Sequence, residues 1–241
     1  LLAYTKLEEV FNKVYSKFKG NFDNHIATSI PTFRETQVKV GSALVEMLPD
    51  NSLVYDIGGS EGGFVKAITE VSGGKIKSIN LDVNESMQKA HENSPVEGSV
   101  FVNEAFYESY TDEDTGKTYN KHIPNEKADV VHESMVFQFI TPERKSFIKE
   151  VKDSYLKNDG ILLLEEKVVP LTDEQWLANE SRKDAYKLNF YTQEEISGKA
   201  EEVLLGMRQN QTQEEDLINA LKEEFTFVQE YWDAGNFKGY I

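Results

Sequence analysis

Short apolar runs and longer amphipathic stretches alternate along the first two thirds of the chain. Five runs have the length and composition of strands: Leu53–Asp56, Lys75–Asp82, Gly98–Val102, Ala128–Glu133 and Ile161–Leu164. The last of these is wholly apolar, as expected of a strand buried on both faces. Helical patterns separate the runs, and strands that alternate with helices form a parallel sheet. The pattern therefore predicts an α/β fold.

The first 50 residues predict helices that precede the sheet. Leu7, Val10, Phe11, Val14, Tyr15 and Phe18 follow helical spacing. They predict an amphipathic helix that packs on the domain or covers its cofactor. The stretch Phe22–Arg34 has no clean period and predicts a loop or short turns near the site. Thr36–Met47 predicts a second amphipathic helix.

Turn and cap signals divide the rest of the chain. The polar stretch Tyr110–Asn125 predicts an exposed hairpin insertion. Thr141-Pro142 predicts the start of a helix that Asn158-Asp159-Gly160 ends. Phe225–Trp232 and Asn236–Ile241 predict an antiparallel pair of strands that closes the sheet. Three threonines followed by acidic or amide residues predict further helix caps: Thr172, Thr192 and Thr212.

A glycine-rich loop follows the first strand and organises the chain. Asp56-Ile57-Gly58-Gly59-Ser60-Glu61-Gly62 leads into the helix-like Phe64–Ile68. Glycines let the backbone turn sharply and approach a ligand closely. The spacing is neither the dinucleotide G-x-G-x-x-G nor a P-loop with its Lys-Ser/Thr. It predicts a cofactor loop, although any tight strand-to-helix turn favours glycine.

The second strand ends in an acid, Asp82, about 20 residues beyond the loop, where such folds place a carboxylate on ribose hydroxyls. A carboxylate suits two vicinal hydroxyls because it accepts both hydrogen bonds. The alternative is that Asp82 only caps the following helix, Asn84–His91.

Composition and charge narrow the possible functions. The 241 residues include no cysteine, which excludes disulfides, thiolate metal sites and a cysteine nucleophile. The net charge of −16 disfavours a broad phosphate-binding surface, so nucleic acid is disfavoured but not excluded. No apolar run or leader predicts a membrane span or export, so we expect a cytoplasmic protein.

The loop and Asp82 resemble those of class I S-adenosylmethionine methyltransferases, and later motifs resemble the bacterial carboxy-S-adenosylmethionine synthases, which supply wobble-uridine modification of tRNA. The motifs run nearly end to end: Phe22-Asp23, Ser29-Ile30-Pro31-x-Phe33, Gln138-Phe139-Ile140, Glu166-Lys167, Tyr191-Thr192-x-x-Glu195-Ile196-Ser197-x-Lys199 and Asn236-Phe237. The family has tyrosine where this chain has Phe33.

The resemblance implies a single domain over residues 1–241 with a Rossmann-like, mostly parallel sheet, an antiparallel last strand and a helical cover. Its parts are a helical cap (1–50), a cofactor-binding core (51–170), a helical cover (171–224) and closing strands (225–241). The implied cofactor is S-adenosyl-L-methionine. Its predicted binding residues are Asp56, Gly58, Gly59, Ser60, Gly62, Asp82, Val83, Ala105, Phe106, Ser134, Phe33 and Arg34.

The chain departs from the family at two positions. The family has cysteine in place of Gly59, and arginine in place of Ala200. That arginine pairs with the extra carboxylate of the carboxylated cofactor. An unpaired buried carboxylate is costly, so alanine predicts a preference for ordinary S-adenosylmethionine. Lys199, Arg182 and Lys187 are the candidate substitutes.

Methyl transfer from a sulfonium requires alignment and, for some acceptors, removal of a proton. His132 and Glu133 are the predicted catalytic residues, with Glu165 and Glu166 as further strand-end candidates; His132 has the most suitable unperturbed pKa. The alternative for His132 is a hydrogen bond to backbone. Trp176, Tyr186 and Tyr191 either line an acceptor pocket or belong to the core, and no metal is predicted.

The sequence thus predicts an S-adenosylmethionine-dependent methyltransferase that acts on a small molecule or protein, with a possible homo-oligomer. One alternative is an enzyme like the carboxy-S-adenosylmethionine synthases. Another is a non-catalytic binding module whose acidic surface meets a basic partner.

Overall fold

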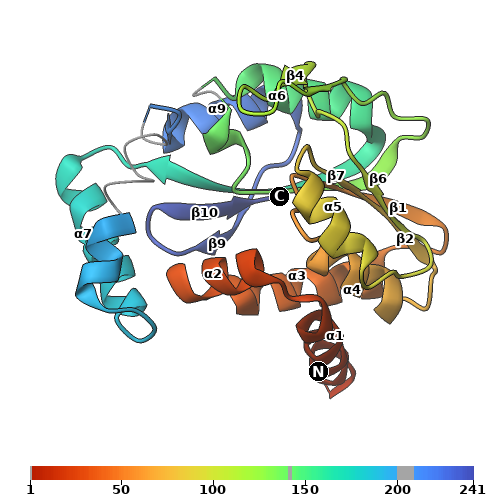
Figure 1. Cartoon of the computed structure of the whole chain (residues 1–241), viewed down its shortest axis with the longest axis horizontal. Helices are drawn as coiled ribbons and strands as arrows, with labels where there is room; N and C mark the ends of the chain where they lie inside the picture. The colour runs from red at the N-terminus through yellow and green to blue at the C-terminus, as the bar shows by residue number, and fades with distance from the viewer. Residues whose placement is uncertain (1, 141–142, 200–208) are drawn as a thin grey trace. The chain divides into compact units, whose positions relative to one another are not determined.

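The computed structural model describes residues 2–140, 143–199 and 209–241 (Figure 1). The chain divides into two compact units. The first unit contains the chain up to Asn24, Arg34–Glu133 and Val151–Leu162. The second contains His25–Phe33, Ser134–Glu150 and Leu163–Ile241. The units cut across the predicted cap, core and cover, and the single-domain division stays a prediction.

The first unit is built on a parallel sheet. Strand β1 (Ser52–Ile57) pairs in parallel with both β2 (Ile76–Leu81) and β6 (Ala128–Ser134), and β2 pairs in parallel with β3 (Ser99–Val102). Every residue of β1 is buried. The predicted strands are therefore confirmed, and the central one is covered on both faces, as the apolar composition of parallel strands requires.

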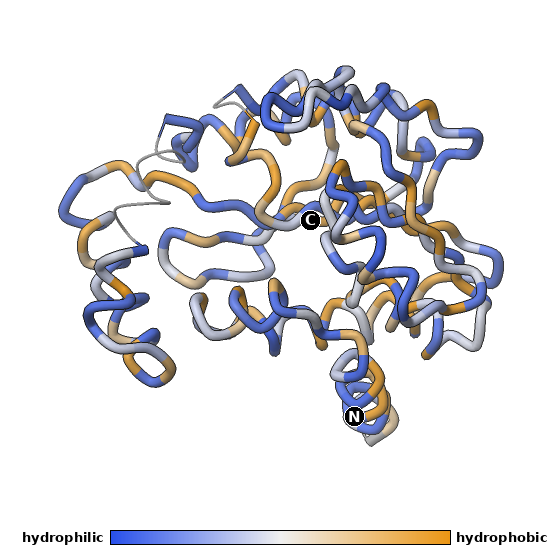
Figure 2. The backbone as a smooth tube through the Cα atoms, viewed as in Figure 1, coloured by the Kyte–Doolittle hydropathy of each residue, from blue (hydrophilic) through white to orange (hydrophobic). Residues whose placement is uncertain are grey.

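Helices α1 (Leu2–Phe18), α3 (Phe33–Met47), α4 (Gly63–Val71) and α5 (Glu85–Glu92) accompany this sheet. Helix α1 carries apolar and polar residues on different sides (Figure 2). Its Phe11 and Tyr15 are buried, with each ring centroid 6.3 Å from that of Phe64 on α4. The predicted amphipathic helix is confirmed, and its apolar side packs on the glycine-loop helix.

The stretch predicted as a loop forms helix α2 (Asn21–Ser29). This prediction was wrong. The segment lacks a strong apolar stripe of its own, and a residue far along the chain supports its start: Glu61 Oε1 accepts a hydrogen bond of 3.3 Å from the backbone N–H of Phe22. Such a tertiary cap leaves no local signal in the sequence.

The predicted hairpin insertion is confirmed as the antiparallel pair β4 (Tyr110–Thr111) and β5 (Thr118–Tyr119). Strand β7 (Leu156–Val169) begins in the first unit and ends in the second. Residues 158–160 therefore lie within a strand, and the predicted helix end there was wrong. Helix α6 (Lys145–Glu150) continues as a π-helical turn (Val151–Tyr155) that ends just before β7.

Gly160, within β7, allows close packing against neighbouring atoms. A Cβ on Gly160 would lie 2.9 Å from Leu156 Cδ2 and 3.2 Å from the carbonyl oxygen of Ala128. The start predicted at Thr141-Pro142 lies outside the described residues.

In the second unit, β7 pairs antiparallel with β10 (Phe237–Tyr240), which pairs antiparallel with β9 (Glu230–Asp233). The predicted closing pair is confirmed. A short strand, β8 (Thr212–Gln213), pairs in parallel with the end of β7. The turn Phe137–Phe139 follows β6.

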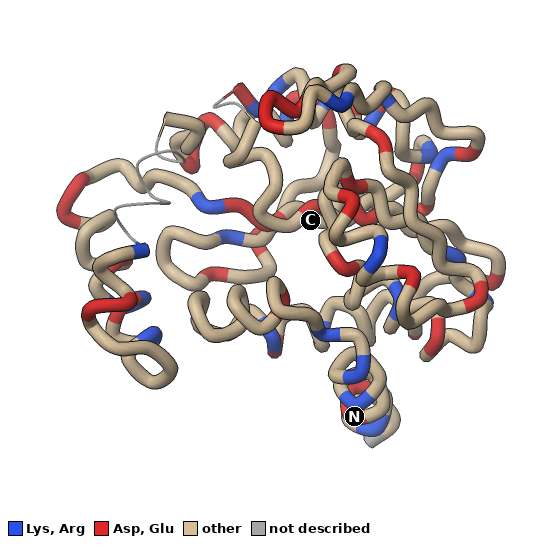
Figure 3. Tube along the Cα trace, viewed as in Figure 1, with Lys and Arg blue, Asp and Glu red and all other residues tan. Residues whose placement is uncertain are grey.

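Two helices of this unit begin close to the predicted caps. The Thr172 side chain caps α7 (Asp173–Lys187), as predicted, by accepting from the Gln175 N–H at 3.2 Å. Thr212 lies instead in β8, and α9 (Glu214–Glu224) begins after Gln213, so this predicted cap was wrong. Lys and Arg positions lie among Asp and Glu positions along α1 and α7 (Figure 3). Among the described helices, none combines the length and the apolar character needed to cross a bilayer.

Candidate cofactor site

The loop between β1 and α4 holds four predicted cofactor residues, Gly58, Gly59, Ser60 and Gly62. Three have left-handed backbone, with φ of 63° at Gly58, 52° at Ser60 and 72° at Gly62. The Gly58 N–H donates to the Leu81 carbonyl at 2.7 Å, and the Gly62 N–H donates to the Gly59 carbonyl at 2.8 Å. The loop is thus a tight turn, bonded to the end of β2, that leads directly into α4.

The other side of this loop is filled by side chains. A Cβ on Gly59 would lie 2.4 Å from Asp56 Oδ2 and 2.5 Å from Asn80 Oδ1. Asn80 also donates from Nδ2 to the Ser60 carbonyl at 2.8 Å, and it is fully buried. Sequence reasoning missed Asn80, although a polar residue in a buried strand just before the acidic end of that strand is a usable signal.

His91 of α5 was also missed. A Cβ on Gly62 would lie 2.4 Å from its Nδ1, so the imidazole fills the space beneath the loop. Its ring centroid lies 5.6 Å from that of Phe101. Burial, aided by the nearby charge of Lys66, lowers the pKa of His91 to about 4, so the ring is neutral at pH 7.

Asp82 lies just beyond β2 and connects to the loop through its carboxylate. Oδ2 accepts from the Ser60 N–H at 3.1 Å, and Oδ1 accepts from the Asn84 N–H at 2.9 Å. Burial raises the pKa of Asp82, while these backbone hydrogen bonds act in the opposite direction. The cap of α5 is Asn84, whose side chain accepts from the Ser86 N–H. The Asp82 carboxylate thus binds the loop through Ser60 and supports the start of α5 through the Asn84 N–H. It still has lone pairs that can accept from further donors.

Asp56 and His132 form a buried pair beneath the loop. They are register partners on β1 and β6, and His132 Nδ1 lies 2.8 Å from Asp56 Oδ1. The His132 ring centroid lies 4.4 Å from that of Phe64. His132 Nδ1 therefore has a carboxylate partner, and the catalytic role of His132 stays a prediction. Glu133, the next residue of β6, is fully buried.

Val83 follows Asp82, and Ala105 and Phe106 follow β3. The Ala105 N–H donates to the Asn120 carbonyl at 2.9 Å, which ties it to the hairpin insertion. The Phe106 carbonyl accepts from Tyr155 Oη at 2.8 Å, and the two ring centroids are 5.3 Å apart. Phe106 is thus held by its backbone and its ring together.

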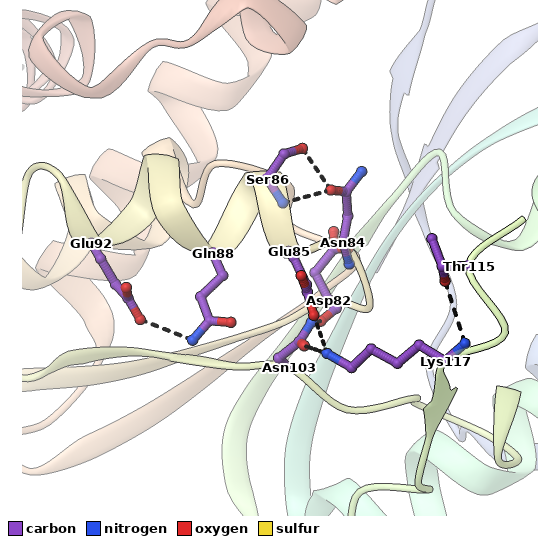
Figure 4. A network of polar contacts seen from close by, with 9 residues as sticks. All are labelled: Asp82, Asn84, Glu85, Ser86, Gln88, Glu92, Asn103, Thr115 and Lys117. Atoms are coloured by element: carbon purple, nitrogen blue, oxygen red, sulfur yellow. Dashed lines mark hydrogen bonds and ion pairs between the residues drawn. The ribbon is translucent and has the colours of Figure 1, made fainter. Parts of the chain in front are cut away.

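The hairpin reaches back to the helix beside Asp82. Lys117 donates to Glu85 Oε1 and, at 3.3 Å, to Asn103 Oδ1, next to Asp82 (Figure 4). Asn103 Nδ2 donates to the Asp82 carbonyl at 3.0 Å. The insertion therefore supports the acidic end of β2, a role that its polar composition did not predict.

Arg34, predicted to meet the cofactor carboxylate, lies in the first turn of α3. Its guanidinium carbon is 3.8 Å from the Tyr15 ring centroid, and Nη2 donates to Ser16 Oγ at 3.0 Å. Its cofactor contact stays a prediction. Within the described residues, no group of three or more Asp, Glu or His side chains is arranged to hold a metal ion.

In the second unit, Ser134 and Tyr231 both bind the carboxylate of Glu165. Ser134 Oγ donates to Oε2 at 2.7 Å, and Tyr231 Oη donates to Oε1 at 2.9 Å. A β-bulge in β9 aims the tyrosine: Gly239 pairs with Trp232 but the next residue pairs with Glu230, so Tyr231 is the extra residue.

The bulge works together with a glycine. A Cβ on Gly239, which is the register partner of Glu165, would lie 2.8 Å from Tyr231 Cζ. The phenol ring can therefore cross β10 only because residue 239 has no side chain. Sequence reasoning named Ser134 and Glu165 but missed Tyr231 and Gly239.

Phe33 lies in an apolar cluster of the second unit with Ile30, Met135, Trp232 and Phe237. Its ring centroid is 5.8 Å from that of Trp232. The residues between Ser29 and Phe33, those after β6 and those of the closing strands thus meet in one cluster. Glu166, the other strand-end candidate, is buried and accepts from Arg144 Nη2 at 3.1 Å.

The aromatic residues of the predicted cover are bonded to other segments of the second unit. Tyr186 Oη donates to the Ala27 carbonyl at 2.8 Å, and Tyr191 Oη lies 2.6 Å from Thr28 Oγ1. The Trp176 carbonyl accepts from Asn236 Nδ2 at 3.2 Å. The two tyrosine bonds fasten the segment before and after residue 190 to α2, and the Trp176 bond joins its backbone to Asn236. All three side chains are half-buried, so the pocket and core interpretations both stay predictions.

No family model matches the chain. The carboxy-S-adenosyl-L-methionine synthase of a Nitratiruptor species is 28% identical over 226 residues, which cover 91% of this chain and 87% of that protein. The carboxy-S-adenosyl-L-methionine synthase of Nautilia profundicola is 30% identical over 174 residues, which cover 67% of each chain. The chain belongs to the carboxy-S-adenosyl-L-methionine synthase family.

Solved structures show the fold of this family member. The plantazolicin methyltransferase BpumL in complex with SAH has a TM-score of 0.58 at 11% identity, covering 97% of this chain and 83% of that chain. Human N-acetylserotonin methyltransferase in complex with SAM has a TM-score of 0.51 at 15% identity, covering 86% of this chain and 54% of that chain. The fold is the Rossmann-like fold of class I methyltransferases, as predicted.

Of the two departures from the carboxy-S-adenosyl-L-methionine synthase pattern, the structure describes Gly59 but not Ala200. At residue 59, the close approach of Asp56 and Asn80 leaves no room for a cysteine side chain on this backbone. Ala200 lies outside the described residues. Its neighbour Lys199 has Nζ 3.3 Å from His25 Nδ1 and 5.6 Å from the Tyr191 ring centroid. Of the other suggested substitutes, Arg182 donates to Asn179 and lines a cavity of about 490 Å³ with Lys183 and Lys238.

Proposed function

We propose that this protein is an S-adenosylmethionine-dependent methyltransferase that acts on a small molecule or a protein. The observation that carries the proposal is the hydrogen bond from the Ser60 N–H to the Asp82 carboxylate. It brings the glycine loop and the acidic end of β2 together within one unit. That pairing is what an adenosine-containing cofactor needs at the carboxyl ends of parallel strands.

The residues present fit this cofactor. Asp82 keeps acceptor capacity for vicinal ribose hydroxyls, and the left-handed residues give the loop the sharp turn that lets a ligand approach the backbone. Val83, Ala105 and Phe106 follow the ends of β2 and β3, where the adenine would lie. Phe33, Arg34 and Ser134 complete the set that the family resemblance implies.

When bound, the cofactor supplies a methyl group on a positively charged sulfur. The task of the protein is to orient the acceptor and, for hydroxyl or amine acceptors, to take its proton. His132 and Glu133 are the proposed catalytic residues. The bond between His132 Nδ1 and Asp56 fixes the ring orientation, and it also joins the candidate base to the first residue of the loop motif.

Membership of the carboxy-S-adenosyl-L-methionine synthase family favours a second candidate, synthesis of the carboxylated cofactor. The two candidates differ in the group on sulfur. Alanine at position 200 removes the arginine that the family pairs with the extra carboxylate, which favours the methyl donor.

Mass spectrometry of ligand released from the purified protein tests both candidates. S-adenosylmethionine or its demethylated product supports the methyltransferase, whereas the carboxylated cofactor supports the family reaction. Asp82→Ala should co-purify with far less of either, because it loses charge-assisted bonds worth about 1–3 kcal/mol. Glu92→Gln, at the exposed far end of α5, is the matched control and should retain the ligand. Equal occupancy of wild type and Asp82→Ala would contradict the proposed site.

A further inference from the structure

Two carboxylic acids from distant parts of the chain meet behind the cofactor loop, within the first unit. Glu61 is a residue of the loop itself, and Asp23 lies in the first turn of α2. Glu61 Oε1 accepts from the Phe22 N–H at 3.3 Å, so the loop residue caps the helix that carries Asp23. Glu61 is only 9% exposed.

Two glycines make this meeting possible. A Cβ on Gly20 would lie 2.1 Å from Glu61 Cδ, and a Cβ on Gly63 would lie 2.7 Å from Asp23 Oδ2. Gly63 is the first residue of α4, whose capping position has no side-chain hydrogen bond. Each acid therefore lies at the start of the helix that belongs to the other: Glu61 at α2, and Asp23 at α4. Helix N-termini favour negative charge.

The carboxylates are incompletely satisfied. Asp23 Oδ2 and Glu61 Oε2 are buried without a hydrogen-bond partner, and neither acid forms an ion pair within the described part of the chain. The charged groups around them are Asp56, Arg34 and Lys66. Arg34 is bonded to Ser16, and Lys66 donates to the carbonyls of His91 and Ser94.

Such a pair does not hold two negative charges easily. Burial, followed by the charge of Glu61, raises the pKa of Asp23 to about 7; Arg34 opposes this shift and Asp56 adds to it. In other proteins, two carboxyl groups that are close together and shielded from water avoid this repulsion by retaining one proton between them.

We propose that the neighbouring acids Asp23 and Glu61 together hold one proton, and that this singly charged pair keeps the cofactor loop in its binding shape. They are positioning residues, because they act on Ser60 and Gly62 on either side of Glu61. When the proton leaves to solvent, the two charges repel. Glu61 then leaves the start of α2, and the bond from Ser60 to Asp82 weakens with it. The inference rests on the proposed function, since the affected property is cofactor binding.

The test is titration calorimetry of wild type and Asp23→Asn with S-adenosylmethionine between pH 6 and pH 9. Wild-type affinity should fall with rising pH by roughly tenfold more than that of Asp23→Asn, which stays neutral at every pH. The amino group of the ligand also titrates in this range, and its contribution is the same for both proteins. Glu61→Gln should flatten the profile as Asp23→Asn does. Glu70→Gln, an exposed acid of α4 paired with Lys17 at 3.2 Å, should keep the wild-type profile.

Identical pH profiles for wild type, Asp23→Asn and Glu61→Gln would overturn the shared proton and leave the proposed function standing. Absence of binding to every folded protein at every pH would overturn the proposed function. In that case the pH dependence of stability, measured by urea unfolding, still tests whether the Asp23–Glu61 pair holds a proton. Because the pKa of Asp23 is raised in the folded protein, the folded state binds the proton more tightly than the unfolded chain does. Asp23 therefore stabilises the folded protein fully below its unfolded pKa near 4, and this contribution is lost as pH rises to about 7. Asp23→Asn should abolish that loss, and an unchanged loss would overturn the pair as well.

Discussion

The glycine loop of the first unit and the Ser134–Glu165–Tyr231 network of the second hold their groups by different means. The turn of the loop is set mainly by backbone, with left-handed residues and the N–H groups of Gly58 and Gly62 bonded to carbonyls, and Asp82 and Asn80 add side-chain bonds at Ser60. The network is shaped by side chains that converge on one buried carboxylate through a bulge and a missing Cβ. A few consecutive residues determine the backbone shape of such a turn. Which side chains converge on one group depends instead on the register between strands that are distant in the sequence.

The largest effect is expected at Gly62. Gly62→Ala adds strain at φ 72° and places a Cβ 2.4 Å from His91 Nδ1. We expect a loss of about 3–4 kcal/mol in the free energy of unfolding, measured by urea denaturation. Gly73→Ala is the matched control, because Gly73 has φ 67° and no atom within 4 Å of its Cβ position. It should lose only about 1 kcal/mol. Equal losses would show that the loop is not packed from beneath.

The next effect concerns His91 under the loop. Because its pKa is lowered to about 4 in the folded protein, the unfolded chain binds more protons between pH 6.5 and pH 4. The His91 contribution is therefore present above pH 6.5 and is lost as pH falls toward 4, by about 3 kcal/mol. Comparing urea unfolding of wild type and His91→Gln at pH 7 and pH 4.5 isolates this slope. If the two proteins lose the same stability on acidification, the buried imidazole is not the cause.

In the second unit, Gly239→Ala should displace the Tyr231 ring. A Cβ 2.8 Å from Tyr231 Cζ is too close, and we expect a loss of about 1–2 kcal/mol. The same change in a Tyr231→Ala background should cost less, because only the contact of 3.1 Å with Trp232 Cβ remains. Thermal unfolding of the four proteins of this cycle measures the coupling, and full additivity would contradict the described path of the ring.

The smallest effect is expected at the hairpin. Lys117 and Glu85 are exposed, and their ion pair contributes little in water. Lys117→Ala should leave Tm unchanged while making the segment Tyr110–Lys121 more open to limited proteolysis. A large drop in Tm would mean that the insertion supports Asp82 more strongly than its exposure indicates.

Local patterns predicted the regular parts of the fold correctly. The strand at Ile161–Leu164, the Thr172 cap and the tight turn at Gly58–Gly62 each have their cause within a few residues, and all three are confirmed as structural elements. Helix α2 was missed because its supporting acceptor, Glu61, lies 39 positions away. The helix end predicted at Gly160 was wrong for a related reason. The small size of Gly160 allows the Ala128 carbonyl to approach closely, and this contact has no local signal in the sequence.

The candidate site shows the same division. The tight turn at Gly58–Gly62 and its contact with Asp82 were predictable from glycine spacing and from the acid at the end of the second strand, and their role as cofactor residues stays a prediction. Asn80, His91, Tyr231 and Gly239 were not predictable, because their roles follow from strand register, from the packing beneath the loop and from a bulge. None of these has a sequence pattern of its own.

Titration calorimetry of S-adenosylmethionine into folded wild-type protein and Asp82→Ala at pH 7 tests the central claim most directly. The predicted result is saturable binding to wild type with one site per chain. In Asp82→Ala the affinity should be weaker by about 1–3 kcal/mol, roughly tenfold to a hundredfold. No binding to wild type at high micromolar ligand, or equal binding to both proteins, would contradict the assignment of the glycine loop and Asp82 as the cofactor site.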